Sequence, residues 1–183
     1  LYAVMNGDEN VHSITERSVD LADKCYISPF LAEDYGALAE ALFELWQRET
    51  GPAAEATRRR FLRLLRRLRA CGVRFQRARA KALLWQGLFD WTQRKPAAAL
   101  QRLREAIAWA EKMEQPYDQA LAELWLGRLA LRGELGSAQV ALGEPSLVAA
   151  HRRFAGPRLA LTYYVERIGD ALRDGAPRPH SSP

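Results

Sequence analysis

The stretch that decides the fold is residues 96–113, which read PAAALQRLREAIAWAEKM. Pro96 suits the first turn of a helix, because its φ angle is already helical and no hydrogen bond needs its missing N–H. The apolar side chains that follow recur at steps of three and four residues: Ala99, Leu100, Leu103, Ala106, Ile107, Ala110 and Met113. This spacing places them along one face of an α-helix. The stretch therefore predicts a helix that buries one face against a neighbour.

The same helical period runs through nearly all of residues 11–173, and no stretch alternates like a β-strand for more than a few residues. Connections between the helical segments are mostly short, which favours antiparallel neighbours. We expect helix pairs at about 11–49, 53–93, 96–135 and 145–173. These pairs predict one all-α domain over residues 1–174. The Pro- and Ser-rich segment 175–183 is expected to be a disordered tail.

Glycine and proline set the expected helix boundaries. Gly51 and Pro52 interrupt the chain and open a new helix. We expect that helix to stop near Gly72, because glycine readily adopts the left-handed conformation that closes many helices. Residues 133–146 contain three glycines and a proline and are expected to form the one long irregular connection.

Short sequence matches indicate an internal repeat. LFEL at 42–45 matches LFDW at 88–91, and PAA at 52–54 recurs at 96–98. The offset of 44–46 residues corresponds to one helix pair with its turns. Helix pairs repeated at a fixed spacing are typical of a solenoid, in which each pair buries its face against the next. The predicted fold class is therefore all-α, with antiparallel helix pairs stacked as an α-solenoid.

The central pair resembles a tetratricopeptide repeat. Gly87 stands where that motif has its small residue on the first helix, and Ala99, Leu103 and Ala106 follow at the spacing of the second helix. Small residues at these points let two helices approach closely, and the larger one fills the groove between them. The match is partial, because Asp90 stands where an aromatic residue is usual.

The resemblance extends over residues 70–129, and Gly127 begins a second, degraded copy. The runs that carry it are RAKALLWQG at 79–87, AIAWAEKM at 106–113 and PYDQALAELWLGR at 116–128. They are similar to the C-terminal tetratricopeptide region of large bacterial signal-transduction ATPases, including those attached to class III adenylyl cyclases or to transcription activators. The resemblance implies a regulatory or partner-binding role and carries over no catalytic residue. Because the chain starts at Leu1, we expect it to be part of a larger signalling protein.

No arrangement of residues in the sequence indicates catalysis. The glycines of residues 133–146 lack the Gly-Lys-Ser/Thr ending of a phosphate-binding loop, and no histidine is spaced for metal binding from another histidine or a cysteine. Cys25 and Cys71 lie in helical patterns and are expected to be separate buried thiols in a reducing compartment. No apolar run approaches the ~20 residues that span a bilayer. We predict a cytoplasmic protein that is no enzyme, with no catalytic, cofactor or metal site.

The net charge of +5 conceals an uneven distribution. Residues 1–55 carry eleven acidic and three basic residues, whereas residues 56–89 carry ten arginines, one lysine and no acidic residue. Apolar side chains take one side of the helix that begins this segment, so the arginines are expected to fan across its exposed face. The candidate partner-binding patch consists of Arg59, Arg60, Arg63, Arg66, Arg67, Arg74 and Arg77.

Three interpretations of this patch are open. The arginines pair with the acidic helix at 33–49, they dock an acidic protein partner or upstream domains, or they bind nucleic acid or an anionic membrane. The first predicts that guanidinium groups reach Glu40, Glu44 or Glu49. A phosphate backbone suits such a patch, but no base-reading motif accompanies it. We therefore predict a non-catalytic module for protein–protein interaction or regulation; the alternative is a helical regulatory domain that binds nucleic acid through residues 58–81.

Overall fold

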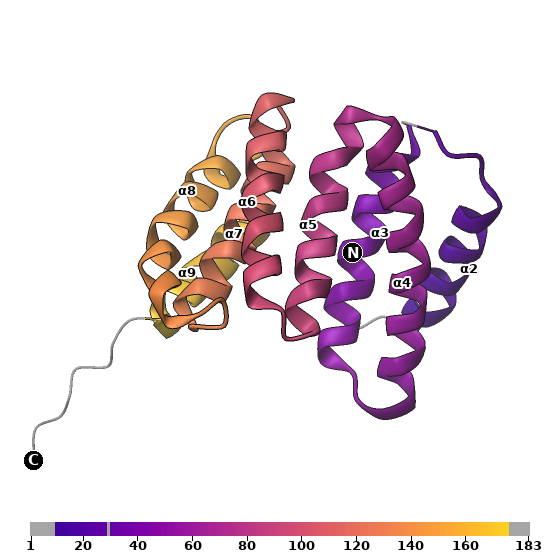
Figure 1. Cartoon of the computed structure of the whole chain (residues 1–183), viewed down its shortest axis with the longest axis horizontal. Helices are drawn as coiled ribbons and strands as arrows, with labels where there is room; N and C mark the ends of the chain where they lie inside the picture. Colours follow the sequence, from indigo (N-terminus) through magenta and orange to yellow (C-terminus); the bar gives the residue numbers. More distant parts are fainter. Residues whose placement is uncertain (1–9, 29, 176–183) are drawn as a thin grey trace, which may run out of the picture. The chain divides into compact units, whose positions relative to one another are not determined.

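The computed structural model describes residues 10–28 and 30–175, and all regular structure within these ranges is helical (Figure 1). The elements in chain order are α2 (Val11–Lys24), α3 (Leu31–Arg48), α4 (Gly51–Arg74), α5 (Gln76–Thr92), α6 (Pro96–Lys112), α7 (Pro116–Leu131), the 3₁₀ helix η1 (Ser137–Leu142), α8 (Gly143–Ala155) and α9 (Thr162–Gly175). The all-α prediction is confirmed for this part of the chain. Apart from Gly175, the predicted tail lies outside the described residues.

The chain divides into two compact units, Leu1–Trp85 and Gln86–Pro183, with the boundary inside α5. In the first unit α3 packs against α4, and α2 contacts both helices. Its core is aromatic: the ring of Phe43 lies 5.7 Å from that of Phe61 and 5.9 Å from that of Trp85. Aromatic side chains bury a large apolar area each, so this cluster holds α3, α4 and the first part of α5 together.

Helix α2 contributes little to that core. Its buried side chains are Thr15, Val19 and Ala22, which form a narrow stripe along one face. Two of its larger apolar side chains remain in solvent, since Ile14 is 48% exposed and Leu21 is 63% exposed. Hydrophobic burial therefore holds α2 less firmly than it holds α3 and α4.

Helix α4 ends at Arg74, two residues past the predicted stop near Gly72, but the predicted left-handed cap is wrong, because Gly72 does not adopt a positive φ angle. Gly72 serves a close approach instead: a Cβ atom there would lie 2.9 Å from the Cβ of Ala82 and 3.4 Å from the Cα of Arg79. Real Cβ atoms do not tolerate the shorter of these distances. Glycine therefore allows α4 and α5 to meet at this point without ending either helix.

The second unit is built around α7, which contacts α6, α8, α9 and η1. Because neighbours surround α7, its apolar residues occur on every side of the helix instead of in one stripe. An aromatic cluster closes the end formed by α8 and α9, where the rings of Phe154 and Tyr164 stack 4.4 Å apart. The hydroxyl oxygens of Tyr117 and Tyr164 lie 2.6 Å apart and share a hydrogen bond.

The close helix approach predicted at Gly87 is confirmed. A Cβ atom on Gly87 would lie 3.2 Å from the Cβ of Arg102 and 3.3 Å from the backbone oxygen of Ala99, both on α6. Gly127 is more tightly enclosed, since a Cβ atom there would lie 2.7 Å from the Cγ of Leu147 on α8. Both glycines thus stand where two helices meet closely.

The prediction of a long irregular stretch at residues 133–146 is wrong for most of its length. Gly133 and Gly136 do turn the chain, with φ angles of 69° and 103°. Helical structure then resumes, first as η1 and then as α8 from Gly143. Any side chain on Gly143 would collide with that of Leu131. This glycine therefore permits close packing of α8 on α7 and does not signal a loop.

Candidate functional site

Helix α4 carries most of the basic side chains and buries one face. The buried side chains are those of Thr57, Phe61, Leu64, Leu65, Leu68 and Cys71. Since they recur at helical spacing, the arginines of α4 occupy the two flanks and the outer face. Arg59, Arg66, Arg69 and Arg74 are exposed, whereas Arg58, Arg60, Arg63 and Arg67 are half-buried. The predicted basic face therefore contains both exposed and half-buried arginines.

The half-buried arginines on one flank meet acidic side chains of α2. Arg60 Nη2 lies 3.2 Å from Glu16 Oε2. Arg63 Nη1 lies 3.1 Å from Asp20 Oδ1 and 3.5 Å from Asp23 Oδ2. Guanidinium groups match carboxylates in shape and charge, so these contacts align α2 along α4.

Further polar contacts attach both ends of α2. At its end, Arg67 donates a hydrogen bond to the backbone oxygen of Cys25. At its start, His12 Nε2 lies 3.1 Å from Glu49 Oε1, without the alignment of a hydrogen bond. Near its last turn, Tyr35 donates a weak hydrogen bond of 3.5 Å to the backbone oxygen of Ala22. Polar contacts therefore occur along the whole length of α2.

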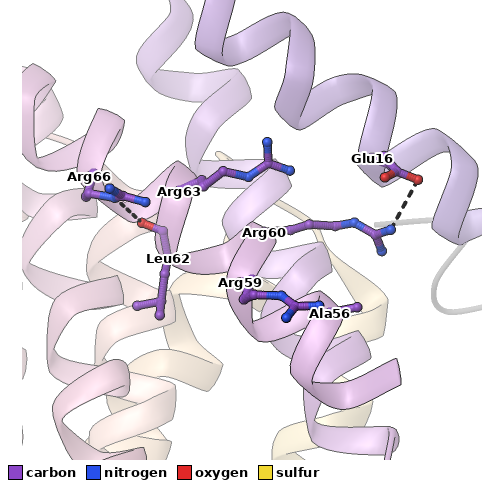
Figure 2. A pocket seen from close by; sticks show the side chains of 7 residues that line it. All are labelled: Glu16, Ala56, Arg59, Arg60, Leu62, Arg63 and Arg66. Atoms are coloured by element: carbon purple, nitrogen blue, oxygen red, sulfur yellow. Dashed lines mark hydrogen bonds and ion pairs between the residues drawn. The ribbon is translucent and has the colours of Figure 1, made fainter. Parts of the chain in front are cut away.

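An open hollow of about 470 Å³ lies beside these ion pairs (Figure 2). Its lining consists of Glu16, Ala56, Arg59, Arg60, Leu62, Arg63 and Arg66. Arg60 reaches toward Glu16, whereas Arg59 and Arg66 lie apart from that carboxylate (Figure 2). Arg66 donates a 3.4 Å hydrogen bond to the backbone oxygen of Leu62, and Arg59 forms no hydrogen bond or ion pair with the described residues. Neither guanidinium is therefore neutralised within this part of the chain.

The structure brings together four of the seven predicted patch residues. Arg59, Arg60, Arg63 and Arg66 line the hollow, and Arg67 lies on the α2 flank. Arg74 and Arg77 are exposed but do not line the hollow; they lie at the end of α4 and the start of α5. Lys81 is buried, with Nζ 2.9 Å from Glu33 Oε1. The basic residues of 58–81 therefore do not all belong to one exposed surface.

The acidic residues that meet Arg60 and Arg63 were not predicted from the sequence. They lie on α2, whereas the predicted acidic partner was the helix at 33–49, which Lys81 contacts through Glu33. A signal was available in the spacing, because the acidic steps from 16 to 20 to 23 mirror the basic steps from 60 to 63 to 67.

A second polar cluster occupies the interior of the second unit. Arg153 Nε donates to both carboxylate oxygens of Glu123, at 3.2 and 3.0 Å, and Gln119 donates to Oε1 at 3.4 Å. Burial raises the pKa of Glu123 above its ordinary value of 4.5, although these two partners act to lower it. The contacts join α7 to α8. We assign them to helix packing.

No group of three or more His, Cys, Asp and Glu side chains in residues 10–28 and 30–175 is arranged to hold a metal ion. Cys25 and Cys71 are both free thiols. No helix in the described ranges combines the length and apolar character needed to cross a membrane.

Comparisons of the chain with protein-family models, curated proteins and solved structures found no match.

Proposed function

We propose that the chain is a non-catalytic helical module that docks an acidic protein partner on the outer face of α4, as a regulatory part of a larger cytoplasmic signalling protein. The observation that carries this proposal is the division of the arginines on α4. Arg60 and Arg63 are already paired with α2, whereas Arg59 and Arg66 line an open hollow and form no ion pair with the carboxylates of the described residues. Unpaired guanidinium groups gathered at a hollow favour an external anion.

Apolar residues on the same face favour a protein over a nucleic acid. The outer face combines the exposed Arg59, Arg66 and Arg69 with the half-buried Leu62 and with Val73, which is 89% exposed. These five residues follow steps of three and four and therefore form one stripe on the helix. Arginine and apolar side chains together are typical of protein interfaces, whereas phosphate contacts are made by charged and hydrogen-bonding groups.

The proposed architecture is a tetratricopeptide-like α-solenoid. It is supported by the direct contacts of consecutive helices, α3 with α4, α6 with α7 and α7 with α8. It is also supported by Gly87 and Gly127, which stand where helices approach closely. Helical repeats of this kind present extended surfaces to other proteins, which agrees with docking instead of catalysis.

Nucleic-acid binding through α4 is the second candidate. It is favoured by the absence of acidic residues from positions 56–89 and by the exposure of Arg59, Arg66 and Arg69. Such binding weakens steeply with salt, because it is driven by the release of counterions from the phosphates. A protein dock shows a milder salt effect, mainly on the association rate.

A binding experiment distinguishes protein docking from nucleic-acid binding. A fluorescent peptide rich in Asp and Glu and a fluorescent DNA duplex are titrated with the protein at about 50 and 150 mM salt. We expect micromolar peptide binding that persists at the higher salt and weaker DNA binding that is lost there. The double variant Arg59→Glu/Arg66→Glu should weaken peptide binding by about tenfold or more, or ~1.4 kcal/mol.

The matched control reverses the exposed Arg152 and Arg158 to Glu. It changes the net charge equally but leaves α4 intact, so peptide binding should be unchanged. Tight DNA binding at the higher salt, lost in the α4 variant alone, would establish the nucleic-acid alternative. Failure of both ligands to bind would exclude a docking role for this face.

A further inference from the structure

Helices α2 and α4 carry complementary charged stripes. Glu16, Asp20 and Asp23 are separated by four and three residues and lie on one face of α2. Against them stand Arg60 and Arg63 of α4, at 3.1 to 3.5 Å between the paired atoms. The contact therefore shows how a helix with an acidic stripe sits on the basic flank of α4.

Neither the charged contacts nor the apolar burial of α2 is extensive. The three carboxylates of α2 remain partly exposed, and exposed ion pairs each contribute little to stability because water and salt screen them. The apolar contact of α2 is the narrow stripe of Val19 and Ala22 beside Thr15. Segments with few buried contacts open at a lower free energy than the core does. Helix α2 is thus the part of the first unit most readily released.

We infer that α2 is a resident acidic ligand of α4 and that the partner is an acidic helix that displaces it. This inference rests on the proposed docking function of α4. In the resting state α2 neutralises Arg60 and Arg63, and Arg67 is engaged by Cys25. The partner takes over these arginines and adds contacts to Arg59 and Arg66, which α2 leaves free of carboxylates.

The attachment of α2 to the same chain explains why the partner needs the additional contacts to Arg59 and Arg66. A segment attached to its own binding surface competes at an effective concentration on the order of millimolar. A free helix with only the contacts of α2 therefore binds weakly while α2 is in place. A partner that also engages Arg59 and Arg66 overcomes this competition, and its binding releases α2 as a signal to adjoining parts of the protein.

The test uses the sequence of α2 itself as the probe. A labelled peptide of residues 10–24 is titrated with the full chain and with the variant Glu16→Gln/Asp20→Asn/Asp23→Asn, whose own α2 has lost its carboxylates. We expect the variant to bind the peptide about tenfold more tightly than the wild type, because its resident competitor is weakened. A peptide with the same three substitutions should bind neither protein. Glu114→Gln/Glu144→Gln/Glu166→Gln is the control for net charge, since these residues are exposed and lie outside the first unit.

Cys25 reports the release of α2 independently of any ligand. It is half-buried at the end of α2, whereas Cys71 is buried in the core. Labelling of Cys25 by a maleimide should be several-fold faster in the α2 variant, while Cys71 stays protected because α3, α4 and α5 remain folded. Protection of Cys71 thus also verifies that the variant has not unfolded.

The outcomes distinguish this inference from the proposed function. Equal peptide affinity for wild type and variant, lost on Arg59→Glu/Arg66→Glu, would leave the docking function standing and overturn the competition by α2. Absence of peptide binding despite rapid Cys25 labelling would overturn the docking function itself. Preferential binding of duplex DNA or anionic vesicles by the variant would refute the acidic-helix partner.

Discussion

Gly127 of α7 lies directly against Leu147 of α8: a Cβ atom on the glycine would come within 2.7 Å of the leucine Cγ. It would also come within 2.9 Å of the backbone oxygen of Gly143, which cannot move aside as a side chain can. We therefore predict that Gly127→Ala lowers the free energy of unfolding by roughly 1–3 kcal/mol through overpacking. This is a net loss even though alanine favours a helix by ~1 kcal/mol relative to glycine. Urea denaturation followed by circular dichroism measures it.

Gly87 supplies the matched comparison. The neighbours of its missing Cβ would be side-chain atoms of Arg102 and Leu103 at 3.2 and 3.4 Å and the backbone oxygen of Ala99 at 3.3 Å. Small shifts relieve these contacts, so Gly87→Ala should cost clearly less than Gly127→Ala. Equal stabilities of the two variants would show that the α7–α8 contact is looser than the structure indicates.

A second prediction concerns the pH dependence of Glu123. Its pKa is raised above 4.5 by burial, so the folded state binds the proton more tightly than the unfolded state does. Stability therefore falls as pH rises from the ordinary pKa of the carboxyl through its raised value. Glu123→Gln has no such titration. We expect the stability of the Gln variant relative to wild type to increase as pH rises above 4.5.

Denaturation of both proteins at several pH values from about 4 to 7 checks this sign. The absolute difference also contains the loss of the charged partner of Arg153, but that loss does not change the sign of the slope across this window. A relative stability that moves in favour of wild type with rising pH would show that Arg153 outweighs burial and lowers the pKa.

Local signals account for what the sequence predicted correctly. Pro96 opens α6 as expected, and Pro116 opens α7 in the same way, because proline fits the first helical turn. The apolar period located the other helices for the same local reason. The glycine cap predicted at 72 and the irregular structure predicted at 143 were wrong, because the missing side chain at these positions allows close helix packing. From sequence alone, a glycine that ends a helix looks the same as one that lets a neighbour approach.

The residue types of the candidate site could be predicted from the sequence, but the pairing of their side chains could not. The excess of arginine identified α4, and the apolar period identified its buried face. The division between paired and unpaired arginines depends on where α2 lies, which is a tertiary contact across some forty residues of chain. Charge alone favoured the longer acidic helix at 33–49, which does pack against α4, because charge patterns do not specify which side chains meet.

A third prediction tests the aromatic core of the first unit. Phe61 is fully buried between Phe43, Trp46 and Trp85, with ring centroids 5.7 to 6.4 Å away. Phe61→Ala should lower the free energy of unfolding by about 3–5 kcal/mol, because it removes apolar contacts and leaves a cavity. Phe30→Ala is the matched control: Phe30 is 87% exposed, so its removal should change stability by less than about 0.5 kcal/mol. Similar losses for the two variants would contradict the placement of Phe61.

The last prediction concerns the two thiols. Cys71 is fully buried, and this burial raises its pKa above the ordinary value of 9.0 despite the nearby charges of Arg67 and Arg74. The thiolate is the reactive form, so Cys71 is less ionised than an ordinary thiol, and it is also less accessible than the half-buried Cys25. At mildly alkaline pH we expect maleimide to label Cys25 at least about tenfold faster than Cys71. Mass spectrometry of wild type, Cys25→Ser and Cys71→Ser over time measures the two rates separately. Labelling of Cys71 should accelerate only as urea unfolds the first unit. Rapid labelling of native Cys71 would show that the folded unit does not bury this thiol.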